Sequence, residues 1–160
     1  MSHIRGMLVE LSTHANRNSG TDDHLYIGVY GTDGGREFPL DAPGDDFETG
    51  TRVTYVLGDV PETLPEWRRP NFSEPGGACD PAALHIDLDS VEQVYIRKQA
   101  KGFGDSDDDA YQLDTVRVVL RAGDDGRAFI LPTPGSKGLW FGNEYGHQAW
   151  LRVLGVNPPS

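Results

Sequence analysis

Apolar and polar residues alternate in short bursts along most of this chain. In residues 25–30 the aliphatic side chains fall at odd positions, between tyrosine and glycine, and a similar alternation recurs in residues 7–13 and 53–57. A period of two is typical of a β-strand whose two faces meet different surroundings. We therefore expect the core to hold Leu25, Ile27, Val29, Val53, Tyr55, Leu57, Val116, Val118 and Leu120.

Turn residues separate these bursts. Thr32-Asp33-Gly34-Gly35 follows the burst at 25–30, and Asp124-Asp125-Gly126 precedes the apolar residues 128–131. Asp-Gly is a strong hairpin signal, because glycine accepts a positive φ angle without a steric penalty. The sequence therefore predicts antiparallel strands joined by tight turns.

The second half of the chain repeats this pattern. It indicates strands at residues 84–88, 94–96, 111–120, 139–141 and 149–154. No segment longer than about ten residues has helical periodicity. These elements predict an all-β fold, an antiparallel β-sandwich of about eight strands.

The strand at 111–120 contains a shift in its alternation. Tyr111 and Leu113 are odd-numbered, whereas the apolar residues from Val116 onwards are even-numbered. A β-bulge inserts one extra residue into a strand, so a bulge near Asp114–Thr115 would absorb the shift.

Residues 59–83 differ in composition from the rest of the chain. They hold five prolines and the pair Gly76-Gly77, which disfavour regular structure. At 160 residues the chain fits one domain, so we interpret 1–160 as one sandwich and 59–83 as an irregular insertion. We expect Trp67 and Phe72 to provide most of the packing of this insertion.

The chain is acidic, with 25 Asp and Glu against 14 Lys and Arg, a net charge of -11. Such a surface repels a phosphate backbone, which argues against nucleic-acid binding, and it repels anionic lipid unless a cation intervenes. No apolar run approaches the roughly 20 residues of a membrane span, so we expect no transmembrane segment. The first residues lack the apolar region of a secretory signal, so we expect a cytoplasmic location or leave the location open.

Sequence motifs of catalysis are absent. The chain lacks a Gly-x-Ser-x-Gly elbow, a His-Glu-x-x-His pair and a phosphate-binding Gly-Lys-Ser/Thr loop. We expect His85 and Asp87 to share a strand face as an exposed polar pair. Cys79 is the single cysteine, and no basic residue stands near it in the sequence. We therefore predict that the chain is not an enzyme.

Three stretches, in order, resemble the PLAT/LH2 domain family, which occurs in lipoxygenases, lipases and bacterial phospholipase toxins. They are Gly20-Thr21-Asp22 before the strand Tyr-Ile-Gly-Val-Tyr-Gly, then Phe47-Glu48-Thr49-Gly50, then the segment from Asp108 to Val118. The last is similar to the family's Asp-Trp-x-Leu-x-x-Val-x-Val, with Ala110-Tyr111 where the family has tryptophan. The resemblance implies a C2-like β-sandwich and a bacterial PLAT-like protein.

Carboxylates concentrate in three predicted loops. Calcium takes six to eight oxygen ligands, which converging loops of a sandwich can supply, and the resemblance implies calcium ligands in the Gly-Thr-Asp turn and the acidic loop before the last motif. The candidate metal residues are Gly20, Thr21, Asp22, Asp23, Asp45, Asp46, Asp107, Asp108 and Asp109. The alternative is that these are ordinary solvated turns, since aspartate favours turns. A helix-loop-helix calcium motif is rejected, because Ala110 and Val116 replace its glycine and glutamate.

Large aromatic residues in loops form the other candidate site. They are Trp67 and Phe72 in the insertion and Phe103 before the third acidic loop. The resemblance implies that such residues enter a lipid interface, while in many proteins they cover a small satellite core.

Three functions remain open. The first, which we favour, is a non-catalytic module that binds a protein or a lipid surface, with calcium assisting. The second is a carbohydrate-binding β-sandwich, with Trp140, Tyr145 and Trp150 as stacking platforms. The third is a small β-sandwich enzyme of unknown type.

Overall fold

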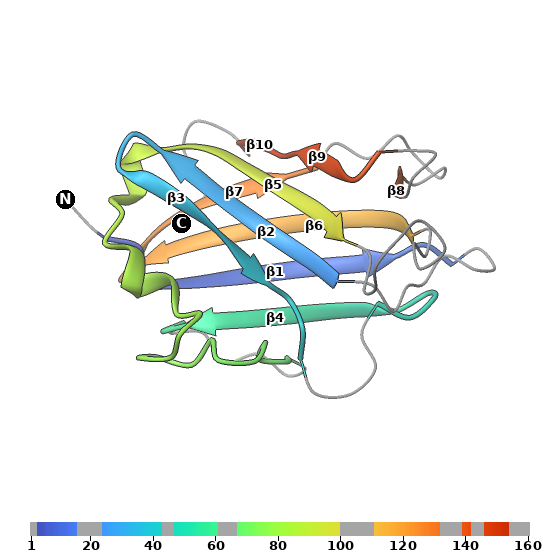
Figure 1. The fold of residues 1–160 in the computed structure, drawn as a ribbon, viewed down its shortest axis with the longest axis horizontal. Coiled ribbons are helices and arrows are strands. Elements are labelled where there is room, and N and C mark those ends of the chain that lie inside the picture. The colour runs from blue at the N-terminus through green and yellow to red at the C-terminus, as the bar shows by residue number, and fades with distance from the viewer. Residues whose placement is uncertain are drawn as a thin grey trace.

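The computed structural model describes residues 3–15, 24–42, 47–60, 67–99, 111–131, 139–141 and 146–153. They form two antiparallel β-sheets that pack face to face (Figure 1). The larger sheet has the strand order β10-β7-β6-β1-β4, with β8 also paired to β6, and the smaller has the order β3-β2-β5-β9. The strands are β1 (Gly6–Thr13), β2 (His24–Gly31), β3 (Gly34–Pro39), β4 (Arg52–Gly58), β5 (Val91–Gln99), β6 (Tyr111–Ala122), β7 (Asp125–Ile130), β8 (Leu139–Phe141), β9 (Gln148–Trp150) and β10 (Arg152–Val153).

The predicted antiparallel sandwich is therefore confirmed, and the described residues alone form ten strands where about eight were expected. The β2–β3 hairpin turns through Thr32 and Asp33, and Gly34 there has a φ angle of 115° that only glycine adopts readily. The second hairpin turns one residue earlier than predicted, at Gly123-Asp124, where Gly123 has a φ of 66°.

The core lies between the two sheets, where the predicted positions point. Eight of the nine predicted core residues are buried, and Val53 is partly buried against them. Four aromatic rings fill one region of this core. The ring centroid of Phe47 lies 6.1 Å from that of Tyr55 and 6.3 Å from that of Tyr111. The ring centroids of Tyr111 and Phe141 are 6.4 Å apart. Burial of these large apolar surfaces supplies much of the driving force that holds the sheets together.

The predicted β-bulge in β6 is confirmed. Ser12 pairs with Thr115 and the next residue, Thr13, pairs with Leu113, so Asp114 is the extra residue. The bulge lets Leu113 and Val116 both point into the core although their parity differs.

The predicted strand at residues 84–88 is wrong. The segment connects two short 3-10 helices: it begins at the last residue of η1 (Pro81–Leu84) and ends at the first residue of η2 (Leu88–Ser90). The side chain of Asp80 accepts a hydrogen bond from the backbone of Ala82, and Pro81 fixes the first turn, so local capping overrides the apolar alternation.

The predicted last strand is two short strands in different sheets. β9 pairs with β5 in the smaller sheet, whereas β10 pairs with β7 in the larger one. Leu151 lies between them, is buried, and donates its backbone N–H to the carbonyl of Val94 at 2.8 Å. The chain thus crosses from one sheet to the other at this residue.

Residues 67–80, which we call the edge segment, run beside β4, the last strand of the larger sheet (Figure 1). Val56 N–H donates to the carbonyl of Arg68, and Arg68 N–H donates to the carbonyl of Thr54. These bonds satisfy backbone groups that an uncovered edge strand would leave exposed. Residues 61–66 of the predicted insertion are outside the described part of the chain.

Candidate functional site

Three acidic segments, at 20–23, 45–46 and 107–109, contain the candidate metal residues. The strand ends that flank them lie together at one end of the sandwich, on the right in Figure 1. His24 pairs with Gln99, Ser12 pairs with Arg52, and Thr13 donates its backbone N–H to the carbonyl of Thr51. The candidate metal residues at 20–23, 45–46 and 107–109, and Phe103, lie outside the described residues. Within the described ranges, no group of three His, Cys, Asp or Glu residues is arranged to hold a metal ion.

Trp67 and Phe72 of the edge segment point away from the core. Trp67 is 50% exposed and Phe72 is 67% exposed. The prediction that these two residues pack the insertion onto the sandwich is therefore wrong. Arg69 lies beside Trp67, with its guanidinium carbon 5.7 Å from the indole ring.

Hydrogen bonds and buried polar side chains hold the edge segment instead. Gly58 N–H donates to the carbonyl of Ser73 at 2.6 Å, and Asn71 N–H donates to the carbonyl of Asp41 at 2.7 Å. The buried carboxylate of Asp80 accepts from the backbone of Gly76 at 2.7 Å. The edge segment is thereby tied to β4 and to the residues that follow β3.

Phe72 has an unusual backbone conformation. Its φ angle is 62°, in the left-handed region that side chains with a Cβ rarely occupy. The conformation costs on the order of 1 kcal/mol. The backbone bond from Cys79 to the carbonyl of Phe72, at 2.7 Å, is one of the contacts that maintain it. The edge segment therefore displays a large apolar ring in solvent at a conformational cost.

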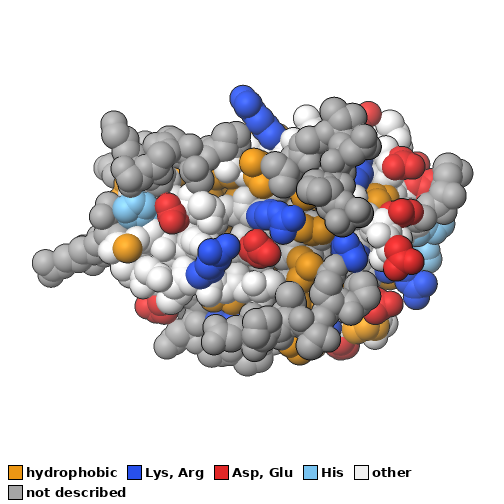
Figure 2. Space-filling view, turned by 180° about the vertical axis from the view of Figure 1, so that it is seen from behind, with side chains coloured by type: hydrophobic (Ala, Val, Ile, Leu, Met, Phe, Trp, Pro, Cys, Tyr) orange, Lys and Arg blue, Asp and Glu red, His pale blue; other side chains and the backbone are white. Residues whose placement is uncertain are grey.

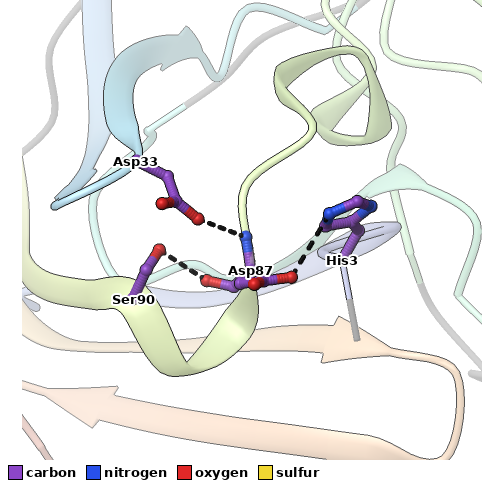
Figure 3. A network of polar contacts seen from close by, with 4 residues as sticks. All are labelled: His3, Asp33, Asp87 and Ser90. Carbon is purple, nitrogen blue, oxygen red and sulfur yellow. Dashed lines mark hydrogen bonds and ion pairs between the residues drawn. The ribbon is translucent and has the colours of Figure 1, made fainter. Parts of the chain in front are cut away.

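A polar network lies at the opposite end of the sandwich (Figure 3). His3 Nε2 lies 3.2 Å from Asp87 Oδ1, and Asp33 in the β2–β3 turn accepts the backbone N–H of Asp87 at 3.2 Å. Ser90 Oγ donates to the backbone carbonyl of Asp87 at 2.7 Å. The network joins the N-terminal segment, the hairpin turn and η2.

This network corrects the expected pairing of His85 with Asp87. His85 takes a left-handed φ of 52° after η1, and Asp87 pairs with His3 instead. A nucleophilic serine is activated by an adjacent general base, most often a histidine, whereas the Ser90 hydroxyl donates to the Asp87 carbonyl.

Cys79 also has a partner that the sequence hid. The Arg36 guanidinium, from β3, donates to Cys79 Sγ at 3.7 Å. No basic residue is close to Cys79 in the sequence, but Arg36 is close to it in the folded structure. The two residues are 43 positions apart in the chain, and only the fold brings their side chains together.

The outer face of the larger sheet is mixed in character. Figure 2, seen from behind the view of Figure 1, shows acidic and basic side chains interspersed with hydrophobic ones. Glu10 on β1 lies 3.5 Å from Arg117 on β6, and Leu8 and Val119 pair next to them. Opposite charges are thus paired across β1 and β6, whereas acidic side chains gather toward the right-hand side of the view in Figure 2.

The outer face of the smaller sheet is aromatic, which the sequence analysis missed. Tyr30 and Tyr95 stack with ring centroids 5.8 Å apart and planes 14° apart, and Trp150 meets Tyr95 edge-on at 5.0 Å. Burial raises the pKa of Tyr95, and its hydrogen bond with Tyr30 acts in the same direction. The signal was present, because tyrosine and glycine occupy the even positions of residues 25–30.

Two of the three aromatic residues proposed as stacking platforms, Trp140 and Trp150, belong to different sheets. Trp150 pairs with Tyr95 in the smaller sheet, whereas Trp140 pairs with Gln112 in the larger sheet. Tyr145 lies outside the described residues.

Two packed antiparallel sheets with this strand order define a β-sandwich domain. A model of the PLAT/LH2 domain family matches residues 7–133. Because the match covers most of the 160 residues, the chain belongs to the PLAT/LH2 domain family.

Relatives with established names share part of their length with this chain. Phospholipase C of Clostridium perfringens is 25% identical over 119 residues, which cover 73% of this chain and 23% of that protein. Phospholipase C of Clostridium novyi is 42% identical over 55 residues, or 34% of this chain and 14% of that protein. The chain therefore spans less than a quarter of the curated relatives it matches.

Solved structures share the fold. Alpha toxin from Clostridium absonum matches with a TM-score of 0.60 at 20% identity, over 94% of this chain and 32% of that chain. Coral 8R-lipoxygenase, for which calcium activation via a C2-like domain is described, matches with a TM-score of 0.56 at 17% identity, over 92% of this chain and 17% of that chain. At these identities the likeness establishes the fold alone.

Proposed function

We propose that this chain is a non-catalytic PLAT module that binds a lipid surface, with calcium assisting. The observation that carries the proposal is the exposed pair Trp67 and Phe72 on the hydrogen-bonded edge segment. Membership of the PLAT/LH2 family and the phospholipase C relatives, whose substrates are phospholipids, support it. No helix in the described residues is long and apolar enough to cross a membrane.

The chemistry of the edge segment suits a membrane interface. Tryptophan and phenylalanine gain free energy by leaving water, and tryptophan prefers the depth of the lipid headgroups. Arg69 places a positive charge next to the Trp67 ring, where it can meet a lipid phosphate. The rigid backbone means that little conformational entropy is lost on binding. Phe103, the third aromatic candidate of the sequence analysis, lies outside the described residues.

Calcium is the second part of the proposal. With a net charge of -11, the chain is repelled by anionic lipid, and a bound dication would reduce that repulsion. The acidic segments at 20–23, 45–46 and 107–109 are the proposed ligands, and the coral lipoxygenase offers a precedent in a domain of the same fold.

Co-sedimentation with vesicles of phosphatidylcholine mixed with the anionic lipid phosphatidylserine tests the proposal. The wild-type chain should bind in millimolar calcium, and the double variant Trp67→Ala, Phe72→Ala should bind at least tenfold less, because it loses both apolar side chains. Chelation should weaken binding of the wild type. The matched control is Trp150→Ala, an equally exposed tryptophan on the other sheet, which should bind vesicles like the wild type.

Two results would contradict the proposal. If the wild type fails to bind vesicles with or without calcium, a protein surface becomes the better candidate for the edge segment. If Trp150→Ala loses binding while the double variant keeps it, lipid contacts the wrong side of the molecule. Melting curves of each variant would separate lost binding from lost folding.

A further inference from the structure

The outward residues of the smaller sheet form a second surface of distinct composition, which we call the aromatic face. It is defined by the outward positions of β3, β2, β5 and β9. Its members are His24, Tyr26, Gly28, Tyr30, Gly35, Glu37, Pro39, Gln93, Tyr95, Arg97, Gln99, Gln148 and Trp150. Large aliphatic side chains are missing from this described set, whereas Leu8, Val56 and Val119 occupy outward positions of the larger sheet.

Two glycines allow the aromatic rings to take their places. A Cβ on Gly28 would lie 2.1 Å from the ring of Tyr95, and a Cβ on Gly35 would lie 2.3 Å from the ring of Tyr30. Tyr95, only 5% exposed, is a buried support, while Tyr30 and Trp150 beside it are 41% and 52% exposed. Packing against Tyr95 holds both exposed rings in place before any ligand arrives.

Polar groups border the rings. The Arg97 Nε donates to Glu37 at 2.6 Å, its Nη1 donates to Gln99 at 3.1 Å, and its guanidinium lies 4.5 Å from the ring of Tyr26. Gln93 and Gln148 add exposed amides, each of which both donates and accepts hydrogen bonds. The face thus combines flat apolar surfaces with fixed donors and acceptors.

The charge of the aromatic face selects among ligand classes. Arg97 and Glu37 neutralise each other, so this face carries no net charge although the whole chain carries -11. A phosphate or another anion finds no excess positive charge here, and a basic peptide finds no excess negative charge. A neutral, hydroxyl-rich ligand with apolar ring faces matches both the stacked aromatics and the amide and guanidinium groups.

We propose that the aromatic face is a binding site for a neutral carbohydrate chain. Sugar rings stack on Trp150 and Tyr30, and their hydroxyl groups hydrogen-bond to Arg97, Glu37 and Gln148. The site is separate from the edge segment, because it lies on the other sheet. It needs no calcium, because the proposed calcium ligands at 20–23, 45–46 and 107–109 are not among its residues.

Affinity electrophoresis of the full chain tests this proposal. The probes are native gels that contain xylan, galactomannan, mixed-linkage β-glucan or hydroxyethyl cellulose. Wild-type protein should be retarded in at least one of the four, equally with calcium and with chelator. Trp150→Ala should lower the association constant at least tenfold, because an exposed aromatic anchor is lost. Trp150→Phe, which keeps a ring, should retain more binding than Trp150→Ala.

The control is Trp67→Ala, which removes an equally exposed tryptophan outside the aromatic face and should be retarded like the wild type. The absence of retardation in all four gels overturns the proposal, as does equal retardation of the wild type and Trp150→Ala. Loss of vesicle binding in Trp150→Ala, without any carbohydrate binding, would also overturn it and would assign this face to lipid. Vesicle binding by the edge segment can fail without affecting any of these results.

Discussion

Gly28 shows how one residue without a side chain shapes a surface. The ring of Tyr95 lies where a Cβ at position 28 would stand, with three ring atoms within 2.6 Å of that point. The backbone of this strand residue needs no positive φ. Glycine is required here for space, not for backbone freedom.

We expect Gly28→Ala to destabilise the fold by about 1–3 kcal/mol, because the new methyl group displaces the Tyr95 ring. Thermal melting measures the loss, and Tyr95 can no longer support Trp150. Gly126→Ala is the matched control, since its Cβ would meet only the flexible end of Arg121 at 3.2 Å and ordinary contacts beyond it. That variant should stay within about 1 kcal/mol of the wild type. Equal melting of both variants would contradict this account.

Tyr111 and Thr13 form a buried polar pair in the core. The Tyr111 hydroxyl lies 2.7 Å from Thr13 Oγ1 and joins β6 to β1. Burial raises the pKa of Tyr111, and the charge of Asp114 adds to the increase while the bond to Thr13 opposes it. The neutral phenol is therefore the form that the folded state favours.

A double-mutant cycle measures this pair. Tyr111→Phe should cost about 1–2 kcal/mol, because Thr13 loses a buried partner, and Thr13→Val should cost a similar amount. The double variant should cost less than the two together, since no polar atom of the pair then remains. Strictly additive losses, measured by denaturant unfolding, would show that the two hydroxyls do not interact.

The same tyrosine predicts a pH dependence. In the unfolded chain tyrosine ionises near pH 10, whereas the raised pKa keeps Tyr111 protonated in the folded state. The folded state then binds more protons, so stability is complete below about pH 10 and falls as the pH rises above it. Unfolding midpoints should show a shallower decline above pH 10 in Tyr111→Phe. An identical decline in both proteins would exclude this tyrosine as a source.

At the scale of elements, β6 depends on one extra residue. The neighbours Ser12 and Thr13 of β1 pair with Thr115 and Leu113 of β6, so Asp114 between these two partners has no partner in β1. Removing Asp114 would leave Leu113 and Val116 on the inner face, with Thr115 alone between them pointing outward. The regular alternation of a strand would be restored.

We therefore expect deletion of Asp114 to leave a folded protein with a β-type circular dichroism spectrum. Deletion of Arg117, in the regular part of β6, is the contrasting variant. Without Arg117, Val116 and Val118 become neighbours in the strand, so only one of them can point inward. The residues on one side of the deletion must then turn their apolar side chains to the outer face, because a slip of one residue exchanges the two faces. This second protein should not fold. Comparable loss of structure in both deletions would show that the bulge is needed for more than register.

At the scale of the whole molecule, the excess of acidic residues affects the stability of the fold. The chain carries 25 acidic against 14 basic residues, and three acidic segments join strands that end at the same end of the sandwich. Like charges brought together destabilise the folded state, and a bound dication relieves that repulsion.

We expect the melting temperature to be higher in millimolar calcium than in chelator. Asp22→Ala and Asp108→Ala should each reduce this gain, because each removes a proposed ligand and part of the repulsion. Asp89→Ala is the control, since Asp89 is exposed in η2 at the opposite end and should not alter the gain. Magnesium should substitute poorly, because it requires a tighter octahedral shell. An unchanged melting curve in calcium would leave these segments as ordinary turns.

The sequence by itself determined the features that depend on neighbouring residues. Alternation in residues 25–30 and 53–57 gave strands and their inward faces, because a strand directs successive side chains to opposite sides. The parity shift in β6 located the bulge at Asp114 for the same reason. Apolar alternation failed at residues 84–88, where a cap from Asp80 and the fixed φ of Pro81 favoured 3-10 turns.

Only the tertiary structure decided which strands became neighbours, and with them both candidate surfaces. Alternation tells on which side of a strand a residue lies but not which strand stands beside it, since pairing joins segments far apart in the chain. Trp150 on β9 meets Tyr95 on β5 in the smaller sheet, whereas Trp140 belongs to β8 in the larger sheet. Nothing in the sequence around the two tryptophans distinguishes these two positions. Trp67 and Phe72 are exposed because backbone bonds and Asp80, rather than these two rings, attach the edge segment to the sandwich.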